Sequence, residues 1–229
     1  MNKSKKIIKE YDEAYFAERD YLPCHLLNVI EILLRQNSIH SVLEVGVGYG
    51  KLMNKLKDLG YNVNGIDISS VAAKLVGATI ASATDIPYPN NQFDCVLGIS
   101  IIEHLTEREG KKFINEAHRV LKEDGIIFLV TPNYSSPLRH IQGKNWFGYS
   151  DKTHVFFYTP NNLSNMLQKN GFKDVRLTFK IRISSLEWHL PSVFYKLPTP
   201  FKYLINYLLV SSPIALFRDS FWVSGRKIK

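Results

Sequence analysis

The sequence predicts an α/β fold, a doubly wound and mostly parallel sheet of seven strands with helices on both faces. Apolar, β-branched runs of strand length alternate along the chain with amphipathic helical segments, as in sheets covered on both faces. A glycine-rich turn follows the first run, and an acidic residue closes the second. Because ligands of such sheets bind at the carboxyl ends of the strands, these two turns are where function is expected.

The elements follow one another in a regular order. The first helix is expected at 15–36, which carries an apolar stripe, and Gly60 ends the second. Pro132 ends the fifth strand, and Thr159 with Pro160 predicts a capped helix start. Strands are expected at 41–47, 62–68, 78–83, 93–100, 126–130, 175–183 and 221–228, and helices at 15–36, 50–59, 69–76, 106–121 and 159–170.

Size and composition indicate one globular domain over 1–229. The chain has 229 residues, of which 45% are hydrophobic and 22% charged, enough for a single buried core. The lysine-rich start lacks the pattern of a secretory signal. Two cysteines are too few for a disulfide scaffold, and Cys95 lies in an apolar run as a buried thiol. A cytoplasmic location is therefore expected.

The net charge of +8 is unevenly spread. The segment 41–110 carries 5 basic and 8 acidic side chains, whereas 171–229 carries 10 basic and 3 acidic ones. A positive C-terminal region can attract an anionic substrate, a membrane surface or nucleic acid. The alternative is a surface that only keeps the protein in solution.

The glycine turn reads Glu44-Val45-Gly46-Val47-Gly48-Tyr49-Gly50. Glycines let the backbone turn tightly and approach a ligand closely. The dinucleotide fingerprint needs a third glycine at position 51, which is Lys51, so the pattern is G-x-G-x-G preceded by Glu44. Taken alone, the glycines are also compatible with a structural turn between strand and helix.

The second strand ends in Asp67 and Ile68. A carboxylate there can accept hydrogen bonds from both hydroxyls of a ribose, and Ile68 offers an apolar face to a purine. The alternative for Asp67 is a helix N-cap, but its position in register with the glycine turn favours ribose binding.

These segments resemble the class I methyltransferases that depend on S-adenosylmethionine (SAM). The segment 42–50, VLEVGVGYG, resembles their motif I, and 65–68, GIDI, the acidic loop after it. IPYPNNQFD at 86–94 resembles the family's LPFPDNSFD stretch, and LKEDG at 121–125 its LKPGG turn. The segment 154–172 resembles H-x-x-F-F-T-P-x-x-L…GF of one subgroup. Each motif is loose, but the ordered set over 41–172 is specific and implies a Rossmann-like fold.

The resemblance implies SAM as cofactor and gives residues definite roles. Glu44 would orient the glycine loop and the methionine amino group, and Asp67 would hold the ribose. The adenine ring would pack on Ile68. The family often has an acidic residue where this chain has Ser82, so Asp85 or the backbone of Ala83 would contact the adenine amino group instead. The residues expected to line SAM are Glu44, Gly46, Gly48, Gly50, Asp67, Ile68, Ser82, Ala83, Asp85 and Ser100.

Two histidines are the candidate catalytic residues. His104 follows the fourth strand in a segment that passes under the sulfonium in the family, and histidine can take a proton from a hydroxyl near neutral pH. His154 faces the substrate side by the same resemblance. Either histidine could instead be structural, with His104 bracing the next helix. No metal is expected.

Two insertions are expected to cover the acceptor site, beside a helical cap at 1–40. The segment 133–158 is rich in aromatic and basic residues, and 184–220 in proline and aromatic ones. The second is a candidate lid, dimer contact or peripheral membrane contact. The predicted function is methyl transfer, most readily to oxygen, on a small-molecule, glycan or lipid-linked acceptor. The alternatives are a nucleic-acid or protein methyltransferase, which only the basic C-terminus suggests, and a SAM-binding protein without catalysis.

Overall fold

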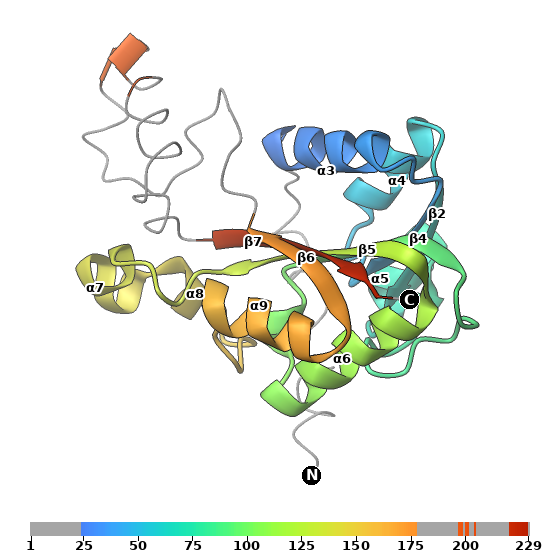
Figure 1. Ribbon diagram of the computed structural model, residues 1–229. Coiled ribbons are helices and arrows are strands. Elements are labelled where there is room, and N and C mark those ends of the chain that lie inside the picture. The colour runs from blue at the N-terminus through green and yellow to red at the C-terminus, as the bar shows by residue number, and fades with distance from the viewer. Residues whose placement is uncertain (1–23, 178–196, 199, 202–203, 205–219, 229) are drawn as a thin grey trace.

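The computed structural model describes residues 24–177, 197–198, 200–201, 204 and 220–228 (Figure 1). The first part of the predicted N-terminal cap and nearly all of the insertion 184–220 therefore lie outside the described residues, as does the predicted strand end at 178–183.

The described elements alternate between helix and strand as predicted. They are α3 (Cys24–Gln36), β1 (Ser41–Val45), α4 (Lys51–Asp58), β2 (Asn62–Asp67), α5 (Ser70–Val76), β3 (Thr79–Ile80), β4 (Phe93–Ile99), the 3-10 helix η1 (Ile102–His104), α6 (Glu107–Val120), β5 (Leu121–Pro132), α7 (Leu138–Gln142), the 3-10 helix η2 (Gly143–Asn145), α8 (Phe147–Ser150), α9 (Pro160–Lys169), β6 (Phe172–Leu177) and β7 (Ser220–Lys227).

The strands form one seven-stranded sheet in the order β3-β2-β1-β4-β5-β7-β6. β7 is antiparallel to both of its neighbours, and the remaining pairs are parallel. The predicted doubly wound, mostly parallel Rossmann-like sheet is thus confirmed. The strand order reverses between β1 and β4, and that reversal marks the edge where ligands bind.

Each face of the sheet has its own apolar core. α3 and α4 cover one face, where Ile30 and Leu56 are fully buried over Val42 of β1. α6 and α9 cover the other face, where Phe113 and Leu163 pack over Leu43. Figure 1 shows these helix pairs on opposite sides of the strands. The alternation of Val42 and Leu43 between the two cores is the two-residue period of a strand buried on both sides.

Helix starts agree with the predicted capping. The Thr159 side chain accepts a hydrogen bond from the Asn162 amide, with Pro160 in the first turn of α9. Thr106 caps α6 in the same way, and its Glu109 partner completes a capping box. These caps fix where each helix leaves the sheet edge and so position the loops of the site.

Three strands have a described boundary that differs from the prediction by three residues or more. β3 is only two residues long, because it forms an outer edge and pairs with β2 alone. β5 begins at Leu121 rather than 126, since Leu121 pairs with Phe93 across an irregular register. β6 begins at Phe172, directly after Gly171, whose φ of +89° turns the chain out of α9.

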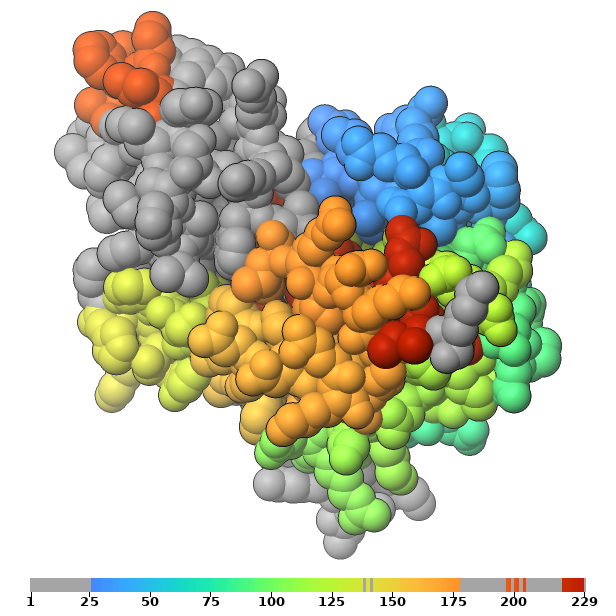
Figure 2. Space-filling model, viewed as in Figure 1, coloured from blue at the N-terminus to red at the C-terminus, as the bar shows by residue number. Residues whose placement is uncertain are grey.

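The insertion 133–158 contains α7, η2 and α8. Figure 2 shows this segment, in yellow, beside α9 at one end of the molecule. Among the residues that the structure describes, no helix is long and apolar enough to cross a membrane.

Candidate active site

The glycine turn joins β1 to α4 in a conformation that requires glycine. The φ angles of Gly46, Gly48 and Gly50 are +80°, +50° and +68°, in the left-handed region that other residues rarely adopt. At Gly50 a Cβ would lie 2.6 Å from Cγ1 of Val76. The amides of Gly46 and Val47 donate to the Ile66 carbonyl at 2.8 and 3.3 Å. The turn is therefore tied to the end of β2.

Asp67 connects the two predicted turns directly. Its Oδ2 accepts a hydrogen bond from the Gly48 amide at 3.0 Å, and its Oδ1 accepts one from the Ser69 amide at 2.8 Å. Ser69, not Asp67, caps α5. Burial raises the pKa of Asp67, although the backbone amides around it favour the carboxylate. The position suits ribose binding, which remains a prediction.

Glu44 lies buried beneath this turn, with 4% of its surface exposed. Burial, reinforced by the nearby Asp67 carboxylate, raises the pKa of Glu44 to about 8. Its Oε2 is buried and has no hydrogen-bond partner among the described residues. A buried carboxyl oxygen left without a partner is destabilising unless a ligand satisfies it. The ammonium group of SAM is the predicted partner, and the three glycines of the turn beside it carry no side chains that would obstruct a ligand.

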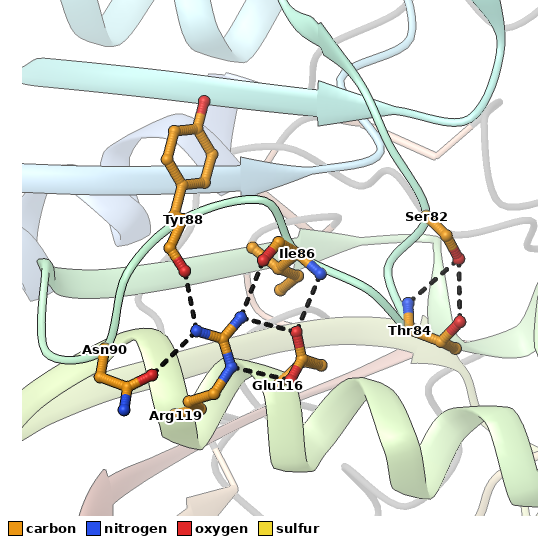
Figure 3. A network of polar contacts seen from close by, with 7 residues as sticks. All are labelled: Ser82, Thr84, Ile86, Tyr88, Asn90, Glu116 and Arg119. Atoms are coloured by element: carbon orange, nitrogen blue, oxygen red, sulfur yellow. Dashed lines mark hydrogen bonds and ion pairs between the residues drawn. The ribbon is translucent and has the colours of Figure 1, made fainter.

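The predicted adenine side lies one strand further out. Ile68 is 40% exposed, which is unusual for an isoleucine next to a buried aspartate and suits a ring packing on it. Ala83 is buried and Asp85 exposed. The Ser82 hydroxyl lies 2.9 Å from that of Thr84 and accepts from the Thr84 amide at 3.1 Å (Figure 3). Ser82 therefore shapes the turn, and Asp85 is the acidic side chain available beside it.

Two side chains of α6 hold the backbone of the loop 86–88, and this clamp was not predicted from the sequence. The Arg119 guanidinium of α6 donates to the carbonyls of Ile86 and Tyr88 at 2.8 and 2.7 Å. It also pairs with both carboxylate oxygens of Glu116, and Oε2 of Glu116 accepts from the Ile86 amide at 2.9 Å. Figure 3 shows both side chains reaching from the helix to the loop. The available signal was a Glu and an Arg three residues apart on a predicted helix.

The segment after β4 contacts the glycine turn shortly before the first histidine. Ser100 is exposed and has a φ of +50°, rare for serine, with its amide donating to the Val130 carbonyl at 2.9 Å. Cδ1 of Ile101 lies 3.0 Å from where a Cβ on Gly46 would be. η1, which ends at His104, therefore begins beside the turn predicted to hold the methionine part of SAM.

Glu103 fastens the second histidine segment onto η1. Its backbone carbonyl accepts hydrogen bonds from the amides of Val155 and Phe156 at 2.9 and 3.2 Å. Its carboxyl Oε2 accepts one from the Thr131 hydroxyl at 3.0 Å. Burial raises the pKa of Glu103 to about 8. Glu103 is thus a bracing residue that the sequence prediction passed over.

The two predicted catalytic histidines come together from positions 50 residues apart. Their ring centroids are 4.8 Å apart in an edge-to-face arrangement. Nδ1 of His154 lies 2.7 Å from the Gly148 carbonyl oxygen, to which it can only donate. Nδ1 of His104 lies 2.8 Å from the Thr153 hydroxyl. The structure brings the pair to the edge of the site, and their catalytic roles remain predictions.

Asp151 and Thr153 complete this cluster, and the sequence prediction missed both. The Thr153 hydroxyl and amide donate to Asp151 Oδ1 at 2.6 and 2.8 Å. Burial opposes the charge on Asp151, but these hydrogen bonds and the two histidines lower its pKa to about 2. Asp151 is therefore a carboxylate at any working pH. An Asp three residues before a candidate His was the only sequence signal.

Among the described residues, one cluster has the spacing of a cation site. Donor atoms of Glu103, His104 and His154 lie within 4.8 Å of one another. Burial raises the pKa of Glu103 to about 8, so a cation bound here would have to displace a proton from this carboxyl. The predicted proton-transfer role of the histidines and a cation site are two interpretations of this cluster, which a chelator distinguishes.

The aromatic residues of the insertion pack mainly on one another. Trp146 is fully buried and makes ring contacts with Tyr134, Tyr149 and Phe157. The Arg139 guanidinium carbon lies 4.2 Å from the Tyr134 ring centroid. Trp146 thus forms the core of the insertion, while Tyr149 is 38% exposed.

Comparison with known proteins agrees with this geometry. Residues 15–177 match the family model described as a methyltransferase domain. The chain belongs to the methyltransferase domain family. An uncharacterized methyltransferase of Anoxybacillus flavithermus is 26% identical over 71% of this chain and 81% of its own. One of Oceanobacillus iheyensis is 33% identical over 40% of this chain.

The chain spans under half, 46%, of the Oceanobacillus relative's length. A SAM-dependent methyltransferase from Archaeoglobus fulgidus has the same fold, with a TM-score of 0.66, covering 94% of this chain and all of its own at 20% identity. Membership of the family confirms the predicted class, a SAM-dependent methyltransferase, and with it SAM as cofactor. The methyltransferase domain's acceptor and the role of each residue are separate questions.

Proposed function

We propose that this methyltransferase domain transfers a methyl group from SAM to a hydroxyl oxygen of a small-molecule, glycan or lipid-linked acceptor. One observation carries the proposal. His104 ends a segment that begins beside the glycine turn, and its ring is held through Nδ1 by Thr153. An imidazole held three residues after Ile101, which contacts the glycine turn, suits an acceptor that must lose a proton, as a hydroxyl must.

Each residue of the cofactor side would bind a different part of SAM. The partnerless Oε2 of Glu44 would take up the ammonium group, and the glycine turn with Ser100 would line the methionine part. Asp67 would exchange its bond from the Gly48 amide for ribose hydroxyls. Ile68 would pack on adenine, with Ala83 and Asp85 at its polar edge. Most of these contacts come from backbone or carboxylate groups.

Bound SAM supplies a methyl group on a positively charged sulfur, and the carbon–sulfur bond breaks with its electron pair left on sulfur. The acceptor oxygen forms the new bond to carbon, and its proton passes to a ring nitrogen of His104. Alignment of the two reactants can lower the barrier by about 7–11 kcal/mol. A general base adds about 10²–10⁴-fold, so His104 would be the smaller contributor.

The first experiment tests the cofactor side alone. Calorimetry should show that the full-length chain binds SAM and S-adenosylhomocysteine and does not bind NAD. Gly48→Val and Asp67→Ala should weaken binding, while Asp58→Asn on the exposed side of α4 should leave it unchanged. Unchanged affinity in both site variants would disprove the assignment.

The second experiment tests the acceptor. Release of S-adenosylhomocysteine is measured with pools of hydroxylated small molecules, glycans and lipid-linked glycans, and separately with RNA and a peptide mixture. Turnover with a hydroxyl pool supports the proposal. Turnover only with RNA or peptides would replace it by the corresponding alternative, and tight SAM binding without turnover in any pool would indicate a binding protein.

We also propose that 184–220 meets a membrane surface near lipid-linked acceptors. The support is its sequence, in which Lys196, Lys202 and Arg218 flank an apolar, aromatic stretch. Each cation near an anionic surface contributes about 1 kcal/mol. In liposome flotation, wild-type protein should bind anionic vesicles at low salt, and Lys196→Glu/Lys202→Glu should not. Wild-type protein that stays off the vesicles would remove this contact.

A further inference from the structure

The cluster beside η1 contains a continuous chain of hydrogen bonds that ends at the proposed base. We propose that Asp151 and Thr153 are positioning residues that hold one tautomer of His104 and present its Nε2 as the proton acceptor. The inference deepens the proposed function and rests on it for the role of His104 in catalysis. The tautomer itself can be measured independently of any acceptor.

The tautomer follows from counting protons along the chain. Asp151 is a carboxylate and can only accept hydrogen bonds. The Thr153 hydroxyl lies 2.6 Å from Asp151 Oδ1, so its single proton points to Asp151. The same oxygen lies 2.8 Å from Nδ1 of His104 and must accept there. Nδ1 of His104 therefore carries a proton, which in a neutral imidazole leaves the lone pair on Nε2.

The chain is fixed in place by its surroundings. Thr153 is buried, with 4% of its surface exposed, so water competes little for its hydroxyl. The Thr153 amide donates to the same Asp151 oxygen at 2.8 Å, which sets the turn. The amides of Val155 and Phe156 donate to the carbonyl of Glu103, the residue directly before His104. The two ends of the chain are thus held in register by the backbone.

The charge of Asp151 favours the same role for His104 as the hydrogen bonds do. When His104 takes a proton, the imidazolium forms near the Asp151 carboxylate, which stabilises it. The other titratable groups of the described residues that face His104 are Glu103 and His154. A carboxyl oxygen of Glu103 lies within 4.8 Å of the histidine nitrogens, but burial raises the pKa of Glu103 to about 8, so this carboxyl is largely neutral near pH 7. His154 donates to the Gly148 carbonyl. Asp151 is therefore the anion that acts on His104.

The test measures directly which ring nitrogen of His104 carries the proton. Long-range ¹H–¹⁵N NMR correlations are recorded on the full-length, ¹⁵N-labelled chain with S-adenosylhomocysteine bound, and His104→Gln identifies the His104 signals. Wild-type protein should show neutral His104 with its proton on Nδ1. Thr153→Val should shift the equilibrium toward the Nε2–H form, and Thr153→Ser should restore the wild-type pattern. Asp151→Asn should lower the pH at which His104 titrates by about one pH unit.

The outcomes separate this inference from the proposed function. An Nε2–H tautomer in wild-type protein, or no change in Thr153→Val, would overturn it, provided S-adenosylhomocysteine affinity shows the variants are folded. Asp58→Asn is the matched control and should leave the His104 signals in place. Signals that shift on adding a chelator to the purified protein would assign the cluster to a metal instead. Failure to find an acceptor leaves the tautomer result standing. With an acceptor in hand, Thr153→Val should lower kcat at least tenfold without changing SAM affinity.

Discussion

The cofactor side and the acceptor side of this site are held together in different ways. On the cofactor side, backbone amides of the glycine turn donate to the end of β2 and to Asp67, 19 residues further along the chain. On the acceptor side, His104 is held by a hydroxyl 49 residues away, and Glu103 by one 28 residues away. Backbone amides are the donors on the first side, whereas on the second side the histidine and carboxyl groups are held by side-chain hydroxyls, on segments that backbone hydrogen bonds join.

This difference determines which residues of each side can be substituted. Backbone donors require only that the chain can adopt the turn. The cofactor side therefore restricts the residue type at only a few glycines and one or two carboxylates. The hydroxyl and imidazole groups of the acceptor side could be replaced by other polar residues without altering the sheet. We therefore expect the binding of SAM and the choice of acceptor to be separable, so that variants affect one without the other.

The largest expected effect is on turnover. His104→Ala should lower kcat by about 10²–10⁴-fold because it removes the proposed base, while SAM affinity stays within about threefold. Calorimetry and S-adenosylhomocysteine release measure the two quantities on the same preparation. If affinity and turnover fall together, His104 packs on the cofactor, and the two sides are not separable as described.

The next effect compares the two glycines that flank α4. Gly50 and Gly60 both have positive φ, +68° and +89°, but a Cβ would lie 2.6 Å from Val76 at Gly50 and within 4 Å of nothing at Gly60. Both Gly→Ala variants share the strain of the left-handed region, about 1–2 kcal/mol. Only Gly50→Ala adds overpacking, about 2 kcal/mol, and should weaken SAM binding about 30-fold.

Denaturant unfolding and calorimetry together measure this comparison. Gly60→Ala should lose stability and keep its SAM affinity. Equal affinity losses in both variants would mean that α4 as a whole, rather than the close approach at Gly50, carries the effect.

A third prediction separates two buried carboxyls, one on each side. Glu44 and Glu103 both have a pKa of about 8, but only Glu44 is expected to meet the SAM ammonium group. Binding should then release about one proton near pH 7, so SAM affinity should rise by up to about tenfold per pH unit and level off above pH 8. Calorimetry in buffers of different ionisation enthalpy counts the proton.

The raised pKa of Glu44 also predicts how the stability of the protein changes with pH. The folded pKa of Glu44 lies above its ordinary value of 4.5, so the ligand-free protein should lose stability as pH rises from about 4.5 to 8. Glu44→Gln should abolish proton release and flatten this loss, whereas Glu103→Gln should keep proton release on SAM binding. Release that persists in Glu44→Gln would assign the proton to another group.

The sequence predicted the sheet and the glycine turn better than the contacts around the histidines, for physical reasons. The sheet, the glycine turn and Asp67 depend on local patterns: strand periodicity, positive φ, and a residue at a strand end. The two-residue length of β3 and the early start of β5 depend on pairing partners, which a local pattern does not contain.

On the acceptor side, the sequence identified the histidines as candidates but not the residues that hold them. Histidine is rare enough near a strand end to stand out, whereas Asp151 and Thr153 look like any polar loop. Their function depends on the docking of 153–156 on Glu103, a contact between segments 50 residues apart. Arg119 was missed for the same reason, because its partners lie in a loop about 30 residues earlier.

The smallest predicted effect tests whether side-chain clamps also matter on the cofactor side. Arg119→Lys keeps the charge but loses the planar fork that holds the Ile86 and Tyr88 carbonyls. Stability should fall by about 1–2 kcal/mol, and SAM affinity by only two- to threefold, since Ser82, Ala83 and Asp85 shift with the loop. Hydrogen exchange should quicken at 86–90.

Arg35 provides the matched control, because it also pairs with a glutamate one turn earlier, Glu31, yet its side chain is 69% exposed. Such exposed pairs contribute about 0.3–0.5 kcal/mol, so Arg35→Lys should leave both stability and SAM affinity close to wild type. A similar loss in both variants would mean that helix charge pairing, and not the loop, is what Arg119 supports. A loss confined to Arg119→Lys, with turnover per bound SAM unchanged, would show that loosening the cofactor side leaves the acceptor chemistry intact.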